Sequence, residues 1–230
     1  MLLRFFLKQN IYALLTIKHW LLISSGFSCL LLSARVMITG HLTYIFLVWN
    51  LFLAFLPFAI TEWLWVFIRK ERSKPLLMTF VFLWLMFVPN SFYILTDLFH
   101  LEQFHSAPKW FDLLLIFSFA WNGLVLGILS VRKTELILES VSGRGFSLFI
   151  VFIVMWLNAF GIYIGRYLRY NSWDIIMQPF ALFREMLELL LHPARNKMEW
   201  GMIMVYAMFM TLLYTTIKKL GENFQPADQI

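Results

Sequence analysis

The chain has 230 residues, of which 61% are hydrophobic and only 14% are charged. Soluble domains carry about 25% charged residues, so this composition excludes an ordinary soluble protein. The mean hydropathy of +0.75 and apolar blocks of about 20 residues, the length that crosses a bilayer core, predict a membrane protein. The net charge of +6 does not predict a nucleic-acid partner, because the basic residues cluster at the ends of the apolar segments.

The apolar segments predict an all-α fold, a polytopic transmembrane helical bundle with about six spans, forming a single integral membrane domain over residues 1–230. Residues 1–18 mix apolar and basic side chains and predict an interfacial helix that precedes the bundle. In the first span, Arg35 can snorkel outward from the apolar segment. The expected spans, in chain order, cover residues 20–39, 42–68, 75–96, 111–131, 146–167 and 199–217.

A further helix is expected over residues 174–192, between the fifth and sixth spans. Pro179 suits the first helical position, and Pro193 lies just past the expected end. One face of this helix is apolar and the other carries Arg184 and Glu188. This pattern predicts a short helix on the membrane surface.

The distribution of basic residues predicts the orientation of the chain in the cell membrane. With the N-terminus inside, most of the 19 Lys and Arg residues lie on the inner side. Because Lys and Arg are enriched in cytoplasmic loops, we expect both termini in the cytoplasm. The ends of the odd-numbered spans then lie at the extracytoplasmic face.

A polar stripe follows the apolar run of the third span. At 100° per residue, Asn90, Tyr93, Asp97 and His100 lie within roughly 80° of one another on an α-helix, and Glu102 extends the stripe weakly. Polar groups are costly in lipid, so the stripe is expected to face protein or water. This makes it the first candidate for a functional site.

A second polar group of residues follows the fifth span. Gly161 and Gly165, four residues apart, allow another helix to approach closely. The expected topology places the end of this span on the same membrane side as Asp97. Its guanidinium groups can therefore pair with Asp97 or with an anionic ligand. The polar residues of this second group are Arg166, Arg169, Asn171 and Asp174.

These two motifs, Val88 to Leu101 (VPNSFYILTDLFHL) and Gly161 to Asp174, carry a family resemblance. The chain resembles the bacterial membrane-protein family catalogued as domain of unknown function 1361, over roughly residues 76–200. Members often have a proline near the position of Phe92, where this chain has none. The resemblance implies a polytopic bacterial membrane protein and supplies no established activity, cofactor or catalytic role.

Several functions remain open at this point. Asp97 and His100 can perform acid–base catalysis, or bind a metal ion together with His105. If the substrate is an anionic amphiphile, the residues that bind it would be Asn90, Tyr93, Arg166, Arg169, Asn171 and Asp174. The structural alternative is that the same side chains cap helices, pair with one another and hydrogen-bond across the bundle. The alternative functions are a small transporter and a structural or accessory membrane subunit. The sequence names no cofactor, and the expected partners are the lipid bilayer and an anionic lipid or other anionic ligand.

Overall fold

The computed structural model describes residues 2–69, 74–102, 106–170 and 177–223, with the backbone alone for 2–16, 68–69, 74 and 102. Its elements are α1 (Leu2–Thr39), α2 (Phe46–Arg69), α3 (Lys74–Tyr93), the 3₁₀ helix η1 (Ile94–Glu102), α4 (Lys109–Ser142), α5 (Arg144–Arg166), α7 (Pro179–Leu191) and α8 (Lys197–Asn223). None of the described residues forms a strand. Six of these helices are long and apolar enough to cross a membrane, so the predicted all-α, multi-pass fold is confirmed.

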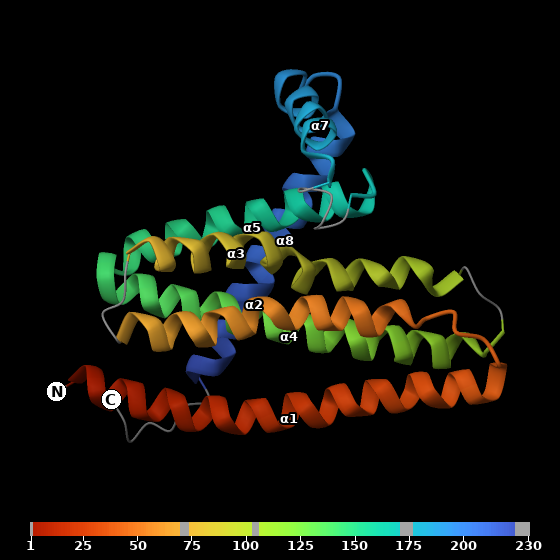
Figure 1. The fold of residues 1–230 in the computed structure, drawn as a ribbon, viewed down its shortest axis with the longest axis horizontal. Helices are drawn as coiled ribbons and strands as arrows, with labels where there is room; N and C mark the ends of the chain where they lie inside the picture. Colours follow the sequence, from red (N-terminus) through yellow and green to blue (C-terminus); the bar gives the residue numbers. More distant parts are fainter. Residues whose placement is uncertain (1, 70–73, 103–105, 171–176, 224–230) are drawn as a thin grey trace.

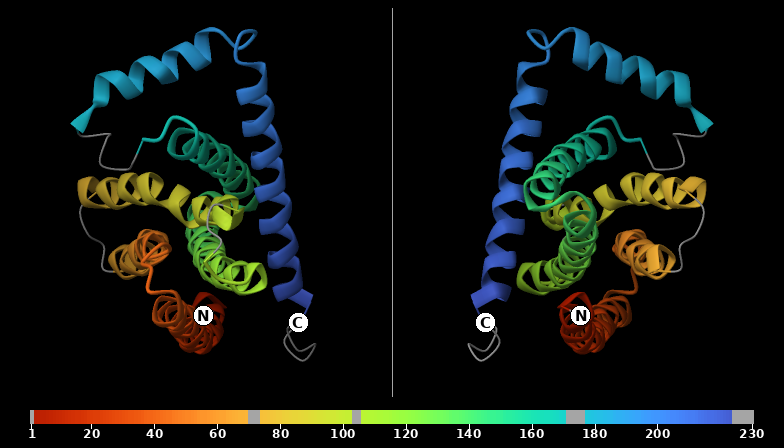
Figure 2. Two further views of the ribbon diagram at one scale, coloured as in Figure 1. Left: turned by 90° about the vertical axis from the view of Figure 1, so that its right-hand side faces the viewer. Right: turned by 90° about the vertical axis from the view of Figure 1, so that its left-hand side faces the viewer.

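The helices α1 to α5 run side by side along the long axis of the molecule, whereas α8 crosses the others at a steep angle (Figures 1 and 2). A short turn at His192–Asn196 joins α7 to α8. Together α7 and α8 enclose α5 on two sides (Figure 2). The start of α1 and the end of α8 lie towards the same end of the bundle (Figure 1).

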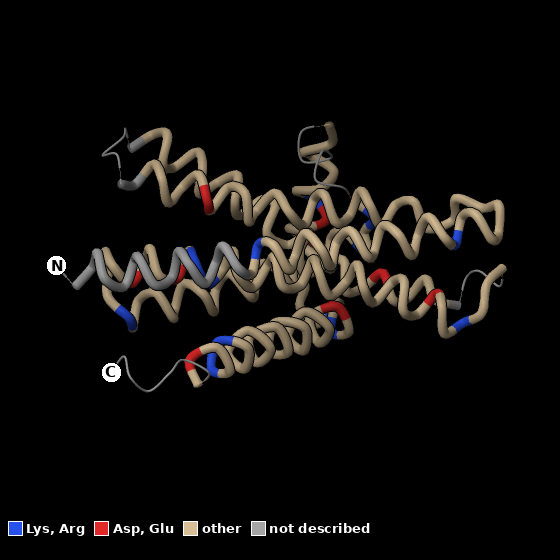
Figure 3. Tube along the Cα trace, turned by 90° about the horizontal axis from the view of Figure 1, so that it is seen from below, with Lys and Arg blue, Asp and Glu red and all other residues tan. Residues whose placement is uncertain are grey.

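The core is centred on α4, of which 67% of the spanning window is buried, against at most 39% for the other five spans. Its side chains Leu115, Ile116 and Phe119 pack with residues of α1 and α2. Further along, Leu124 and Ile128 pack with α3 and α5. The outer faces of the other helices present large apolar side chains, and Figure 3 shows long uncharged stretches along the helices. This is the arrangement expected where lipid surrounds the bundle.

Several boundaries differ from the sequence prediction. The helix α1 runs without a break from Leu2 to Thr39, so residues 2–16 continue the first spanning helix, and their interfacial position stays a prediction. The fourth helix passes its expected end at residue 131 and continues to Ser142. It continues because Lys133 and Glu135, which would end a lipid-facing span, are buried in ion pairs here. The helix predicted after Pro179 is present as α7, and its position on a membrane surface stays a prediction.

The expectation that Arg35 snorkels outward was wrong. Its side chain is fully buried and forms two hydrogen bonds to Asp112, from Nε to Oδ1 at 2.7 Å and from Nη2 to Oδ2 at 3.2 Å. Arg35 also donates to the hydroxyls of Thr43 and Ser106, and its guanidinium lies 4.4 Å from the ring centroid of Tyr44. A bidentate carboxylate is a better partner for a guanidinium than the apolar end of the span. This ion pair joins α1 to the start of α4.

Two ionic clusters join the helices at the opposite end of the bundle. Glu62 of α2 pairs with Lys18 of α1 at 2.7 Å and with Lys133 of α4. The second cluster is centred on Glu135, which is fully buried and is contacted by Arg132, Tyr214 and Lys218. The first cluster thus joins α1 and α2 to α4, and the second fixes α8 against α4 despite its steep crossing.

Candidate functional site

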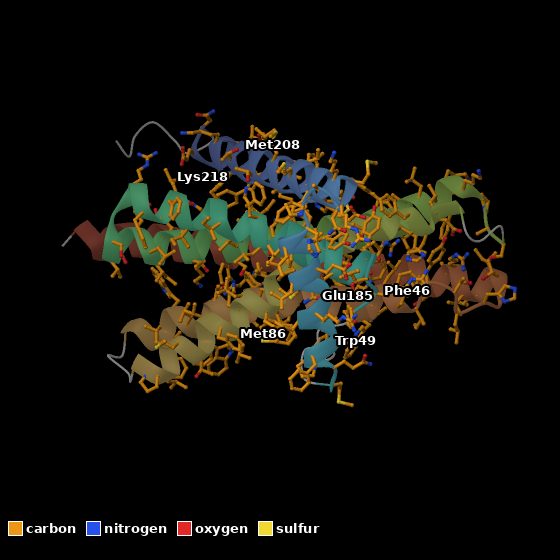
Figure 4. All side chains as sticks on the ribbon, turned by 90° about the horizontal axis from the view of Figure 1, so that it is seen from above. Phe46, Trp49, Met86, Glu185, Met208 and Lys218 are labelled. Carbon is orange, nitrogen blue, oxygen red and sulfur yellow. The ribbon has the colours of Figure 1, made fainter. Side chains whose placement is uncertain are left out.

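A cavity of about 700 Å³ lies between α2, α3, η1, α5 and α7. Leu182 and Met186 of α7 cover it, and Figure 4 looks down on α7 with Met86 of α3 to one side and Phe46 and Trp49 of α2 to the other. The apolar lining residues include Leu53, Phe82, Leu85, Met86, Leu157, Phe160 and Ile164. The polar lining residues include Asn50, Asn90, Tyr93, Asp97, His100, Arg166 and Tyr170.

The polar and apolar linings occupy different ends of this cavity. Along α3 and η1 the lining passes from Phe82 through Asn90 to His100, and along α5 it passes from Leu157 to Arg166. Both series become polar towards the end of the bundle at which α3 continues as η1. The cavity therefore has one polar end and an apolar remainder, as an amphiphilic ligand would require.

Four glycines allow the α3–η1 junction to lie deep in the bundle. A Cβ added at Gly161 would meet Pro89 at 2.8 Å, and one at Gly165 would meet the ring of Tyr93 at 3.1 Å. From α4, Gly123 and Gly127 face Ile94 and Ser91 in the same way. These are the Gly-x-x-x-Gly spacings that permit close helix approach. They place α5 against the junction, and so place Arg166 beside the residues of η1.

The backbone changes from α-helix to 3₁₀ helix at Ile94, so the predicted α-helical stripe is wrong beyond Tyr93. Side chains three residues apart eclipse one another in a 3₁₀ helix. Asp97 and His100 therefore still share a face, and both line the cavity. At the junction, the hydroxyl of Thr96 donates to the carbonyl of Tyr93 at 2.7 Å, which is a local bond of the kind that competes with helix continuation.

Asp97 is 1% exposed and is held by Asn50, whose Nδ2 donates to Oδ2 at 2.7 Å. Nη1 of Arg166 lies 3.9 Å from Oδ1 of Asp97. This is an ion-pair distance, but it exceeds the length of a hydrogen bond. The carboxylate is thus fixed by an amide on α2 and faces a guanidinium on α5.

His100 lies beside the same guanidinium, with its Nε2 2.9 Å from Nη1 of Arg166. A guanidinium can only donate hydrogen bonds, so Nε2 is the acceptor in this contact. The ring packs edge-on against Phe46, with centroids 5.1 Å apart, and Arg166 lies 5.4 Å from the ring centroid of Phe99.

Tyr44 supports η1 from behind the cavity. Its hydroxyl donates to the backbone carbonyl of His100 at 3.2 Å. Burial raises the pKa of Tyr44 to about 12, so the hydroxyl keeps its proton and remains a donor. Because the ring of Tyr44 also packs on Arg35, the buried ion pair and the cavity share one supporting residue.

Most of the sequence-predicted residues of the two motifs are brought together. Asn90, Tyr93, Asp97, His100 and Arg166 all line the cavity. The side-chain amide of Asn90 donates to the carbonyl of Phe87 at 3.1 Å, so this residue also bonds to the backbone of its own helix. Their roles in binding or catalysis stay predictions.

Other predicted residues are placed elsewhere. Arg169 has a positive φ of 60° and an exposed side chain, and it is not among the residues that line the cavity. Asn171, Asp174 and His105 lie outside the described residues. Among the residues that the structure describes, no group of three or more His, Cys, Asp or Glu side chains could hold a metal ion. A cation between Asp97 and His100 would also meet the guanidinium of Arg166.

The sequence analysis missed Asn50 and Tyr170. Asn50 is the direct hydrogen-bond partner of Asp97, and the available signal was a single amide side chain in the middle of the second span. A polar residue inside a span commonly has a partner on another helix, but the sequence does not say which one.

Comparison with known proteins agrees with the resemblance drawn from the two motifs. The family model described as "Protein of unknown function (DUF1361)" matches residues 49–213. The chain belongs to this family. The match to DUF1361 includes Asn50, both polar motifs and α7. No curated protein and no solved structure is similar to the chain.

Proposed function

We propose that this DUF1361 protein binds an amphiphile with an anionic group in its headgroup, at the extracytoplasmic face of a bacterial cell membrane. The observation that carries the proposal is the cavity with one polar end and apolar walls. The headgroup would lie beside Arg166 and His100, and the hydrocarbon chain would extend along Leu85 and Phe160. Sites for small ligands commonly combine such apolar walls with a few convergent polar groups.

Arg166 is the proposed binding residue for the anionic group. A guanidinium has five N–H donors, of which one points to His100. Its planar array suits a phosphate or a carboxylate equally well. The buried surroundings, with 15% of the Arg166 side chain exposed, strengthen such an interaction relative to one in water.

The bilayer is the proposed source of the ligand. Trp49 and Phe82 line the cavity and are also 50% and 61% exposed. Large exposed apolar side chains at the rim of a cavity suit contact with lipid better than contact with water. Entry from the side of the bundle would let the chain of the ligand stay in an apolar medium throughout.

The proposed orientation places both termini in the cytoplasm. The ionic clusters of Lys18, Lys133 and Lys218 lie near one end of the bundle, and the cavity's polar lining lies towards the other. An excess of Lys and Arg is typical of the cytoplasmic side. The exposed apolar side chains Phe180, Phe183 and Leu191 of α7 are then proposed to enter the outer leaflet, as in an interfacial helix.

Native mass spectrometry of the purified protein with an added mixture of dioleoyl phosphatidylglycerol and dioleoyl phosphatidylethanolamine, both of which carry a phosphate, tests the proposal. We expect the wild type to retain lipid from this mixture and Arg166→Gln to bind it at least about tenfold more weakly, because a charge-assisted hydrogen bond is lost. Arg184→Gln, which changes an exposed arginine outside the cavity, is the matched control and should bind like the wild type.

A second pair of variants tests the apolar part of the cavity. Leu53→Trp adds bulk to a half-buried lining residue and should weaken retention, whereas Phe52→Trp changes an exposed neighbour that does not line the cavity. Equal lipid retention by wild type, Arg166→Gln and Leu53→Trp would refute the proposed site. Acid–base catalysis by Asp97 and His100 is a further hypothesis that becomes testable once a ligand is identified.

A further inference from the structure

The polar end of the cavity carries one negative and one positive side chain. Asp97 and Arg166 both line it, 3.9 Å apart, so their opposite charges offset one another. This pair therefore adds no net charge to the polar end. A headgroup with only negative charge would be attracted by Arg166 and repelled by Asp97 at nearly the same distance.

We infer that the headgroup carries a primary ammonium group as well as a phosphate, as in phosphatidylethanolamine. This inference rests on the proposed function, whose ligand class it narrows. The phosphate would bind Arg166, and the ammonium would bind the carboxylate of Asp97. Each charge of a zwitterionic headgroup then faces an opposite charge of the protein.

The carboxylate of Asp97 is positioned to accept a hydrogen bond from the ammonium group of a ligand. Asn50 holds Oδ2 from α2, which fixes the plane of the group, while Oδ1 faces Arg166 without a direct hydrogen bond to it at 3.9 Å. A ligand can therefore add its own hydrogen bonds to both charged groups without breaking one between them. A two-carbon link between ammonium and phosphate suits two side chains that are immediate neighbours.

A primary ammonium fits this site better than a quaternary one. An ammonium group has three N–H donors, and its hydrogen bonds to a carboxylate are of the strong, charge-assisted kind. A choline headgroup has no N–H donor and would leave the buried carboxylate of Asp97 without that bond. The ethanolamine headgroup therefore adds a hydrogen bond to Asp97 that choline and glycerol headgroups cannot match with a positively charged donor, so the site should select against both.

Competition binding of lipids with identical dioleoyl chains to the full-length protein tests this inference. With native mass spectrometry as the readout, we expect phosphatidylethanolamine to be retained at least about tenfold over phosphatidylcholine and phosphatidylglycerol. Asp97→Asn keeps the size of the side chain and removes its charge, so it should abolish this preference. Glu188→Gln, an exposed carboxylate of α7 outside the cavity, should leave the preference unchanged.

The wild type alone gives a second test, which does not depend on whether Asp97→Asn folds. Stepwise N-methylation of the ethanolamine headgroup removes its N–H donors one by one, and retention should fall with each methyl group. Equal retention along this series would overturn the inference. Preferred retention of phosphatidylglycerol that depends on Arg166 would also overturn it while supporting the proposed function, whereas binding of none of the lipids would overturn both.

Discussion

Replacing Gly161 by alanine tests whether the close contact between α5 and the α3–η1 junction positions Arg166. The new Cβ would lie 2.8 Å from Cβ and 2.9 Å from Cγ of Pro89, whereas carbon atoms in contact lie about 3.5–4.0 Å apart. The proline ring is closed onto its own backbone and cannot rotate away. The two helices must therefore separate by roughly half an ångström or more.

The expected loss of stability follows from two opposing terms. Overpacking of a well-packed contact costs about 1–3 kcal/mol, and replacing a glycine inside a helix by alanine recovers about 0.5–1 kcal/mol. The net destabilisation of Gly161→Ala should be about 0.5–2 kcal/mol. Because Arg166 follows on the same helix, the separation should also weaken its contact with His100 and reduce lipid retention.

Thermal unfolding of the purified protein in detergent measures the stability, and native mass spectrometry measures the lipid. Gly201→Ala in α8 is the matched control, because a Cβ there meets nothing within 4 Å. It should leave stability unchanged or raise it by up to about 1 kcal/mol, with lipid retention as in the wild type. If Gly161→Ala behaved like Gly201→Ala in both assays, the close contact would not position Arg166.

Two further predictions concern buried polar contacts, and the same unfolding assay tests them. Asp112→Ala should destabilise the protein by about 3–5 kcal/mol, because it leaves the buried guanidinium of Arg35 without its carboxylate. Its control, Lys219→Ala, breaks an exposed ion pair and should cost at most about 1 kcal/mol. Equal losses of stability in the two variants would contradict this reasoning. Ser130→Ala should lower the stability by about 1–3 kcal/mol, because Oγ of Ser130 accepts a hydrogen bond from the indole N–H of Trp84 at 2.7 Å and both residues are buried. An unchanged unfolding temperature would show that this hydrogen bond does not contribute to stability.

The number of spans could be predicted from the sequence because the bilayer sets the length of each apolar segment. The meeting of Arg166 with Asp97 could also be anticipated, since spans three and five run in the same direction and end at the same side. These inferences need only length and direction. They do not require knowledge of which helix faces meet.

The side-chain partners could not be predicted, because they depend on how each helix is rotated. Arg35 and Asp112 are 77 positions apart, and hydropathy alone favours snorkelling for a charged residue near the end of a span. The role of Asn50 depends in the same way on α2 lying beside η1. The change to a 3₁₀ helix at Ile94 could not be predicted from the polar spacing. Asp97 and His100 are three residues apart, and this spacing places them on one face in an α-helix and in a 3₁₀ helix alike.

Two arginine–aspartate pairs among the described residues differ in a way that separates a structural contact from a candidate site. Arg35 and Asp112 form two direct hydrogen bonds, and hydroxyls and an aromatic ring surround the guanidinium. Burying an ion pair has a large desolvation cost, which is best offset by such direct and complete hydrogen bonding. Asp97 and Arg166 are also largely buried, yet they stand 3.9 Å apart and line a cavity. A pair that serves stability alone would be expected to close to hydrogen-bonding distance, so the open geometry of the second pair favours a ligand that completes it.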